Sequence, residues 1–188
     1  MLNRYFLILL FIPILCSCST NESEQYIFIG DSLVKGYDTE LFFPSLSIQN
    51  KGVSGYRIED CRNLRLNCEG CTAVLLVGTN DLSQNQDVFN EDYIRSFVDE
   101  YIDLVNSLQA KRVIAISILP RNHFDLSKIK QLNQSLSDAL SGEDNAIFLD
   151  VFDDFEREGE LNPEYTNDGL HLTYWGYLLL SKQLSKVL

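Results

Sequence analysis

Apolar segments that alternate with helical segments constrain the fold of this chain more than any other feature. Five short runs are rich in β-branched and aromatic residues, as buried strands are: residues 26–29, 46–49, 73–77, 112–119 and 146–151. Helical spacing of apolar side chains predicts helices over about residues 57–66, 91–108, 125–140 and 174–187, with Asn90 and Thr173 as candidate N-caps. The sequence therefore predicts an α/β fold, a three-layer α/β/α sandwich around a central, mostly parallel five-stranded sheet.

Polar loops that contain glycine follow the first three predicted strands, at residues 30–32, 50–55 and 78–81. Ligands of such a sheet bind outside the carboxyl ends of the strands, so we expect the three loops to gather as a functional site at one edge. The alternative is that glycine and asparagine only make turns there. We interpret Asp31 and Asp81 as residues that fix these turns by hydrogen bonds.

Near the carboxyl terminus, Asp168 and His171 form an Asp-x-x-His pair. A carboxylate three residues ahead of a histidine can accept the Nδ1 proton and aim Nε2 outward as a base. A serine becomes a useful nucleophile when such an oriented base takes its proton, and Ser32 is the candidate. Chance Asp-x-x-His pairs are common, so the pair alone is a weak signal.

Four motifs in chain order resemble those of the SGNH hydrolase family, also called GDSL-type esterases. They are Gly30-Asp31-Ser32-Leu33, Asn50-x-Gly52-x-x-Gly55, Gly78-Thr79-Asn80-Asp81 and Asp168-x-x-His171. The resemblance covers residues 25–188, and the stretches around Asn80 and His171 look like those of the platelet-activating-factor acetylhydrolase branch. It implies a flavodoxin-like SGNH hydrolase fold. The chain has no G-x-S-x-G elbow, which distinguishes it from the standard α/β-hydrolases.

The resemblance also implies a role for each matching residue. Ser32 would be the nucleophile, His171 the general base and then acid, and Asp168 the group that orients His171. The oxyanion hole would consist of the backbone N–H groups of Ser32 and Gly55 and the side-chain amide of Asn80, because fixed donors stabilise the charge of a tetrahedral intermediate. No metal and no organic cofactor is implied.

The function that follows is a serine esterase of short-chain acyl esters, above all acetyl esters, with carbohydrate esters among its substrates. A lysophospholipase or lipase, and an O-acyltransferase that uses the same triad, are the alternative enzymes. A binding lipoprotein with a vestigial site is the alternative outside enzymes, and the presence of all four motif residues disfavours it. The substrate would be a small molecule or a glycan ester.

Three local expectations are less closely tied to the motifs. The segment between Ser32 and Gly55 is short, so we expect no helix after Ser32 and a loop at residues 41–44. Trp175 and Tyr177 are expected in the core. His123 is either a loop residue or part of the pocket lining.

The amino terminus has the pattern of a secretory signal: one basic residue, a short apolar run and small residues. The run is too short to span a bilayer readily, which disfavours a transmembrane anchor. Residues 15–18 also resemble a bacterial lipobox that ends at Cys18. We therefore expect a signal peptide at 1–17, lipidation of Cys18, a tether at 18–24 and a hydrolase domain at 25–188. The mature protein would be an exported lipoprotein of the cell envelope, at the periplasmic face or outer membrane.

Net charge and histidine content restrict the ligands of this chain, and its cysteines indicate a disulfide. The formal net charge of −12 disfavours nucleic acid as a partner, and the two histidines of the chain make a histidine-based metal site improbable. An exported protein meets an oxidising compartment, so we expect a disulfide among Cys61, Cys68 and Cys71. Cys61 could pair with either of the other two, and one thiol would be left over.

Overall fold

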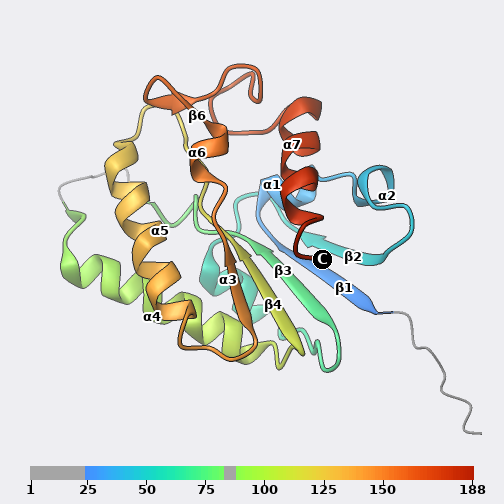
Figure 1. The fold of residues 1–188 in the computed structure, drawn as a ribbon. Helices are drawn as coiled ribbons and strands as arrows, with labels where there is room; N and C mark the ends of the chain where they lie inside the picture. The colour runs from blue at the N-terminus through green and yellow to red at the C-terminus, as the bar shows by residue number, and fades with distance from the viewer. Residues whose placement is uncertain (1–23, 83–87) are drawn as a thin grey trace, which may run out of the picture.

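Five parallel strands form the central sheet of the computed structural model, which describes residues 24–82 and 88–188 (Figure 1). The strands lie in the order β2-β1-β3-β4-β5, so the sheet is doubly wound: β2 lies on one side of β1, and β3 to β5 are added on the other side. Their bounds are β1 Gln25–Gly30, β2 Ser47–Gly52, β3 Thr72–Leu76, β4 Arg112–Ile116 and β5 Ala146–Leu149.

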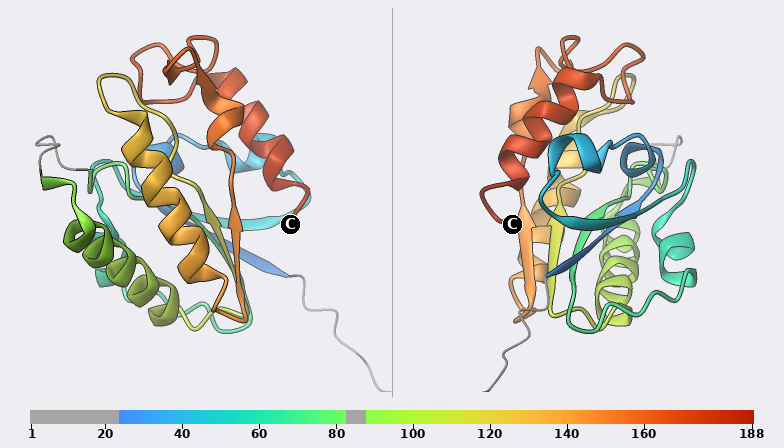
Figure 2. Two further views of the ribbon diagram at one scale, coloured as in Figure 1. Left: turned by 60° about the vertical axis from the view of Figure 1, so that its left-hand side comes forward. Right: turned by 90° about the vertical axis from the view of Figure 1, so that its right-hand side faces the viewer.

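Helices cover both faces of this sheet, as Figure 2 shows. Along β1, Ile27 and Ile29 pack into a core with α3, α4 and α5, whereas Tyr26 and Phe28 pack into a second core with α1 and α7. The predicted three-layer α/β/α fold is confirmed. The helices are α1 Ser32–Lys35, α2 Thr39–Phe42, α3 Ile58–Asn63, α4 Glu91–Ser107, α5 Leu126–Leu140, α6 Phe152–Phe155 and α7 Tyr174–Leu184; β6 Glu156–Arg157 and β7 Glu160–Leu161 form a small hairpin.

Side-chain caps explain where the longer helices begin. The Asn90 side chain accepts a hydrogen bond from the Tyr93 N–H and opens α4. Thr173 accepts from the Gly176 N–H and opens α7. Both predicted N-caps are confirmed, because these side chains satisfy N–H groups that the first helical turn leaves unpaired.

The expectation of no helix after Ser32 is wrong, because α1 and α2 both lie in the segment that connects β1 and β2. Each is a single turn capped by an aspartate: Asp31 accepts from the Leu33 N–H and Asp38 from the Leu41 N–H. Capping by Asp38 within the connection lets this short segment form a helical turn where a plain loop was predicted.

The last residues of two predicted strands leave the sheet because side chains take over their backbone hydrogen bonds. The Asn133 amide accepts from the Ile118 N–H and donates to the Ile118 carbonyl, so β4 stops at Ile116. The Val151 N–H donates to Ser117 Oγ just beyond β5. A sequence pattern of apolar residues does not reveal such side-chain competition.

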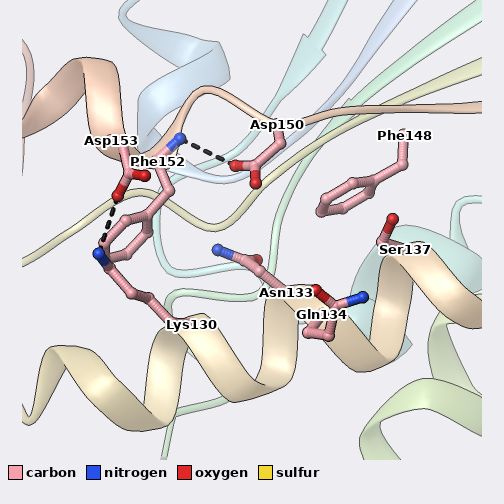
Figure 3. A pocket seen from close by; sticks show the side chains of 8 residues that line it. All are labelled: Lys130, Asn133, Gln134, Ser137, Phe148, Asp150, Phe152 and Asp153. Atoms are coloured by element: carbon pink, nitrogen blue, oxygen red, sulfur yellow. Dashed lines mark hydrogen bonds and ion pairs between the residues drawn. The ribbon is translucent and has the colours of Figure 1, made fainter.

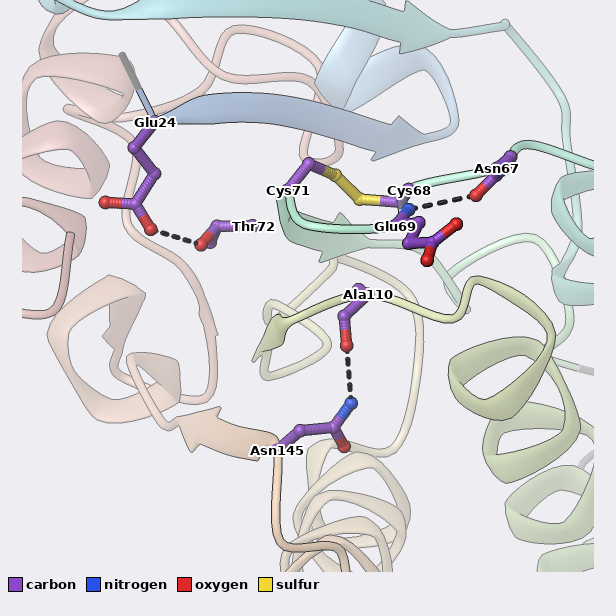
Figure 4. Close-up of a disulfide and its surroundings, with 8 residues drawn as sticks. All are labelled: Glu24, Asn67, Cys68, Glu69, Cys71, Thr72, Ala110 and Asn145. Atoms are coloured by element: carbon purple, nitrogen blue, oxygen red, sulfur yellow. Dashed lines mark hydrogen bonds between the residues drawn. A yellow bond between two sulfur atoms is a disulfide. The ribbon is translucent and has the colours of Figure 1, made fainter. Parts of the chain in front are cut away.

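The disulfide joins Cys68 to Cys71, in the turn before β3 (Figure 4). The two Cα atoms are 5.1 Å apart, and the Cys71 N–H donates to the Cys68 carbonyl across the turn. The expectation that Cys61 is a partner is wrong: it is a free thiol packed in the core from α3. Burial raises the pKa of Cys61 to about 12, which keeps the thiol protonated and unreactive.

The predicted signal peptide 1–17, Cys18 and the tether up to residue 23 lie outside the described residues, and these features stay predictions. The described chain begins at Glu24, which accepts a hydrogen bond from Thr72 Oγ1 at the amino-terminal end of the sheet (Figure 4). Within residues 24–82 and 88–188, no helix has the length and apolar character to cross a bilayer.

Gly52 lets the end of β2 touch the backbone of α1, and we expect Gly52→Ala to destabilise the fold. A Cβ at this position would lie 2.1 Å from the Lys35 nitrogen and 2.6 Å from the Val34 carbonyl carbon, so backbone atoms would have to move. Overpacking of this kind costs about 1–3 kcal/mol of the free energy of unfolding, which urea denaturation measures. Gly142→Ala is the matched control, because its Cβ would meet only the Ala139 carbonyl at an ordinary 3.4 Å. Equal stabilities of the two variants would contradict the close approach.

Candidate active site

The three polar loops end three neighbouring strands of the sheet, as the sequence predicts. Ser32 follows β1 after one intervening residue, Asn80 follows β3, and Gly55 follows β2. Because β1 lies between β2 and β3 and all three strands run parallel, their carboxyl ends meet at one edge. This edge includes the point between β1 and β3 where the order of adding strands reverses, which is where ligands of doubly wound sheets bind.

Ser32, His171 and Asp168 form one chain of hydrogen bonds at this edge. His171 Nε2 lies 3.0 Å from Ser32 Oγ, and these residues are 139 positions apart in the sequence. His171 Nδ1 lies 2.7 Å from Asp168 Oδ2. The structure therefore brings together the three residues that the sequence predicts as a triad, in an order that can remove the proton of a serine hydroxyl.

Ser32 is held by contacts on both sides of the turn that carries it. Asp31 Oδ1 accepts from the Leu33 N–H at 2.8 Å, and the Tyr177 hydroxyl on α7 donates to the Leu33 carbonyl at 2.8 Å. Asp31 is fully buried, and its Oδ2 has no hydrogen-bond partner among the described residues. Burial raises the pKa of Asp31 to about 6, although the Leu33 N–H opposes this shift. Asp31 thus fixes the turn, in agreement with its interpretation from the sequence.

The loop that carries His171 is fixed by its own carboxylate. Asp168 Oδ1 accepts from the N–H groups of Leu170 and His171 while Oδ2 faces the ring. These hydrogen bonds, above all the one from the His171 ring, hold the pKa of Asp168 well below its usual range. Asp168 therefore stays ionised at neutral pH, as a group that orients and stabilises an imidazole must.

Thr166 and Asn122 hold the loop that carries His171 by hydrogen bonds, and the sequence analysis missed both. Thr166 is buried, and its Oγ1 accepts from the Gly169 N–H at 3.0 Å and donates to the His171 carbonyl at 2.8 Å. The Asn122 N–H donates to the Gly169 carbonyl, and the Asn122 side chain fills the space beside Gly169. The one available signal was that Asn122 follows a predicted strand in a polar run.

Asn80 and Gly55 come from loops that are bonded to each other. Asn80 Nδ2 donates to the carbonyl of Tyr56, next to Gly55, at 2.9 Å, which uses one of its two amide hydrogens and leaves the other available. Gly55 has a left-handed φ of 81°, and a Cβ there would meet nothing within 4 Å. Asn50 lies in β2, the strand that precedes Gly55. Its amide donates to the carbonyls of Val34 and Tyr37 and so bonds this strand to α1 and the residues after it.

Other expected positions have mixed outcomes. Tyr177 is buried, which confirms it as a core residue, but Trp175 is 57% exposed, so its expected place in the core is wrong. The buried face of α7 includes Tyr177, Leu180 and Leu184, and helical spacing places Trp175 outside it. His123 is exposed, with a left-handed φ of 61°, and within the described chain no hydrogen bond or ion pair joins it to the triad.

A separate polar pocket lies between α5 and the chain that follows β5 (Figure 3). None of its lining residues belongs to the triad. Its charged groups already have partners: Lys130 forms an ion pair with Asp153 and lies over the Phe152 ring. Among residues 24–82 and 88–188, no cluster of His, Cys, Asp and Glu could hold a metal ion.

Several solved structures share this fold. A Streptococcus pneumonia protein, provisionally described as a platelet activating factor, is 28% identical, with a TM-score of 0.76 over 90% of this chain and 86% of that one. A GDSL-like lipase from Bacteroides thetaiotaomicron is 24% identical, with a TM-score of 0.68 over 87% of each chain. An acetyl xylan esterase, AlAXEase, is 17% identical, with a TM-score of 0.66 over 87% of this chain and 99% of that one.

No curated protein matches the sequence of this chain. The sequence does match the GDSL-like lipase/acylhydrolase family over residues 28–179, a span that includes Ser32, Gly55, Asn80, Asp168 and His171. The fold, the motif order and this match agree. The chain belongs to the GDSL-like lipase/acylhydrolase family, whose members are carboxylic ester hydrolases.

Proposed function

We propose that this protein is a serine esterase that hydrolyses short-chain acyl esters, acetyl esters above all, through an acyl-enzyme on Ser32. The observation that carries the proposal is the continuous path from Ser32 Oγ through His171 to Asp168, with contacts of 3.0 and 2.7 Å. A nucleophile, a base within reach of its proton and a group that orients the base are the parts that covalent ester hydrolysis requires.

The reaction begins when neutral His171 accepts the Ser32 proton at Nε2 as Oγ attacks the ester carbonyl carbon. Asp168, which its hydrogen bonds keep ionised, stabilises the imidazolium that forms. The proton on Nε2 then passes to the oxygen of the leaving alcohol as the acyl-enzyme forms. A water molecule gives a proton to His171 and attacks the acyl carbon, and collapse of that intermediate returns the proton to Ser32 and releases the acid.

The negative charge of each tetrahedral intermediate would lie against three donors. The Ser32 N–H comes from the turn after β1, the Gly55 N–H from the loop after β2, and the second amide hydrogen of Asn80 from the loop after β3. The Tyr56 carbonyl already fixes the Asn80 amide, so little reorganisation accompanies charge development. The open space beside Gly55 gives an acyl group room to approach the backbone.

Carbohydrate esters are the substrates that we propose within this class. An acetyl xylan esterase has the same fold, which supports a site of this architecture acting on a sugar ester. The competing assignments are a lysophospholipase or lipase, which would prefer long acyl chains, and an O-acyltransferase, which would pass the acyl group to a hydroxyl.

Ser32→Ala should abolish hydrolysis of p-nitrophenyl acetate, with kcat falling at least about 10³-fold while circular dichroism shows an intact fold. Ser96→Ala is the matched control, because Ser96 is an exposed serine of α4, outside the loops of the site, and should keep wild-type activity. Full activity of Ser32→Ala would reject the proposed nucleophile.

The activity of the wild type should also fall in acid, since a protonated imidazole cannot accept the Ser32 proton.

A series of p-nitrophenyl esters of increasing acyl length, together with acetylated xylo-oligosaccharides, tests the substrate class. We expect kcat/KM to be highest for acetyl and to fall with chain length, and we expect free acetate from the oligosaccharides. A maximum at long acyl chains would favour a lipase. Acyl groups recovered on added sugar acceptors, without free acid, would favour a transferase.

A further inference from the structure

Asp81 connects the loop that carries Asn80 to the chain that follows Gly55. Its two carboxylate oxygens lie 3.2 and 3.3 Å from the Ile58 nitrogen and accept from that N–H. The adjacent Asn80 amide donates to the Tyr56 carbonyl at 2.9 Å. Asn80 and Asp81 are consecutive, and they bond to Tyr56 and Ile58 of the segment that follows Gly55.

Both ends of this connection are attached to rigid elements. Ile58 is fully buried and is the first residue of α3, so the carboxylate caps the amino end of that helix. On the other side, the Tyr93 hydroxyl of α4 donates to the Asp81 carbonyl at 2.7 Å, and the Asp81 N–H donates to the Gly78 carbonyl. Asp81 therefore has little freedom to move without carrying both loops with it.

We propose that Asp81 is a positioning residue of the oxyanion hole: its carboxylate fixes the distance between the Asn80 amide and the Gly55 N–H. The inference rests on the proposed function, in which these two groups donate to the oxyanion. Asp81 itself does not touch the substrate and acts only through the two loops. Donors that are misplaced by about 1 Å can cost up to about 10²-fold in rate, so the Asp81 carboxylate affects the rate through the positions of the two donors.

The charge of the Asp81 carboxylate, which we call the clamp together with the Ile58 N–H that it accepts from, is sensitive to pH near neutrality. Burial raises the pKa of Asp81 to about 7; the Ile58 N–H and Arg57 oppose this shift, and Glu100 and Asp31 add to it. The charge of the Asp81 carboxylate in turn adds to the raised pKa of the Cys61 thiol on α3. A hydrogen bond to an ionised carboxylate is roughly twice as strong as one to a neutral acceptor, so protonation loosens the clamp.

Two variants test the proposal with p-nitrophenyl acetate. Asp81→Ala removes the acceptor and should lower kcat about 10- to 100-fold with KM within about twofold. Asp81→Asn keeps the shape and one acceptor oxygen, so its loss should be smaller, and it remains informative if Asp81→Ala does not fold. Asp60→Asn is the matched control, because Asp60 accepts from the Arg57 N–H at the same helix end, and among the described residues no hydrogen bond joins its side chain to the Asn80 loop. It should keep wild-type kcat.

A double-mutant cycle asks whether Asp81 acts through Asn80. Asn80→Ala alone should cost about 10²–10³-fold, and Asp81→Ala added to it should cost clearly less than it does in the wild type. A residue that supports only the general stability of the fold would give additive losses. Additive losses, or wild-type kcat in both Asp81 variants, would overturn the proposal.

The pH dependence gives a readout that a purely structural role would not change. Between about pH 8.5 and about pH 5.5, the ratio of wild-type kcat to Asp81→Asn kcat should fall toward one, because the wild-type carboxyl becomes neutral. A pH effect that the two proteins share cancels in the ratio. A constant ratio would contradict an ionised clamp. Ser32→Ala separates the two hypotheses: if it abolishes hydrolysis while the Asp81 variants stay unchanged, only the positioning role fails.

Discussion

The 3.0 Å contact between Ser32 Oγ and His171 Nε2 is the interaction on which the proposed function depends. It joins the residue that opens α1 to a loop that precedes the last helix. The parallel sheet makes the contact possible, because β1 delivers Ser32 to the same edge that the carboxyl-terminal loop reaches. The Tyr177 hydroxyl on α7 then bonds to the Leu33 carbonyl and holds the two ends of the domain together.

Polar side chains, rather than regular secondary structure, set the geometry of the site. Asn50 bonds the end of β2 to α1, Thr166 closes the loop beneath His171, and Asp81 bonds the Asn80 loop to α3. Each of these side chains satisfies backbone groups that loops would otherwise leave unpaired. The proposed oxyanion donors and the proposed base are thus held in place before a substrate binds, which is the condition for electrostatic stabilisation of a transition state.

The sequence could predict the layers, the polar loops at the carboxyl ends of the strands and the residues of the triad, because each of these leaves a local mark. Apolar periodicity marked the strands, and glycine-bearing loops marked their carboxyl ends. Non-local competition for hydrogen bonds leaves no such mark. The Asn133 amide shortens β4 from 15 residues away, which no neighbouring residue indicates. The Asp38 cap of α2 is local, by contrast, and the short segment hid it. Cys61 was expected to pair because it lies near two cysteines in sequence, yet it faces the core from α3.

The most direct test of the central claim is to trap the nucleophile. Diethyl p-nitrophenyl phosphate phosphorylates a serine whose proton an adjacent base removes, and peptide mass spectrometry then identifies the modified residue. We expect a single diethylphosphoryl group on the peptide that contains Ser32, and no such group when His171 is replaced by alanine. Modification of a different residue, or equal modification of Ser32 without His171, would contradict it.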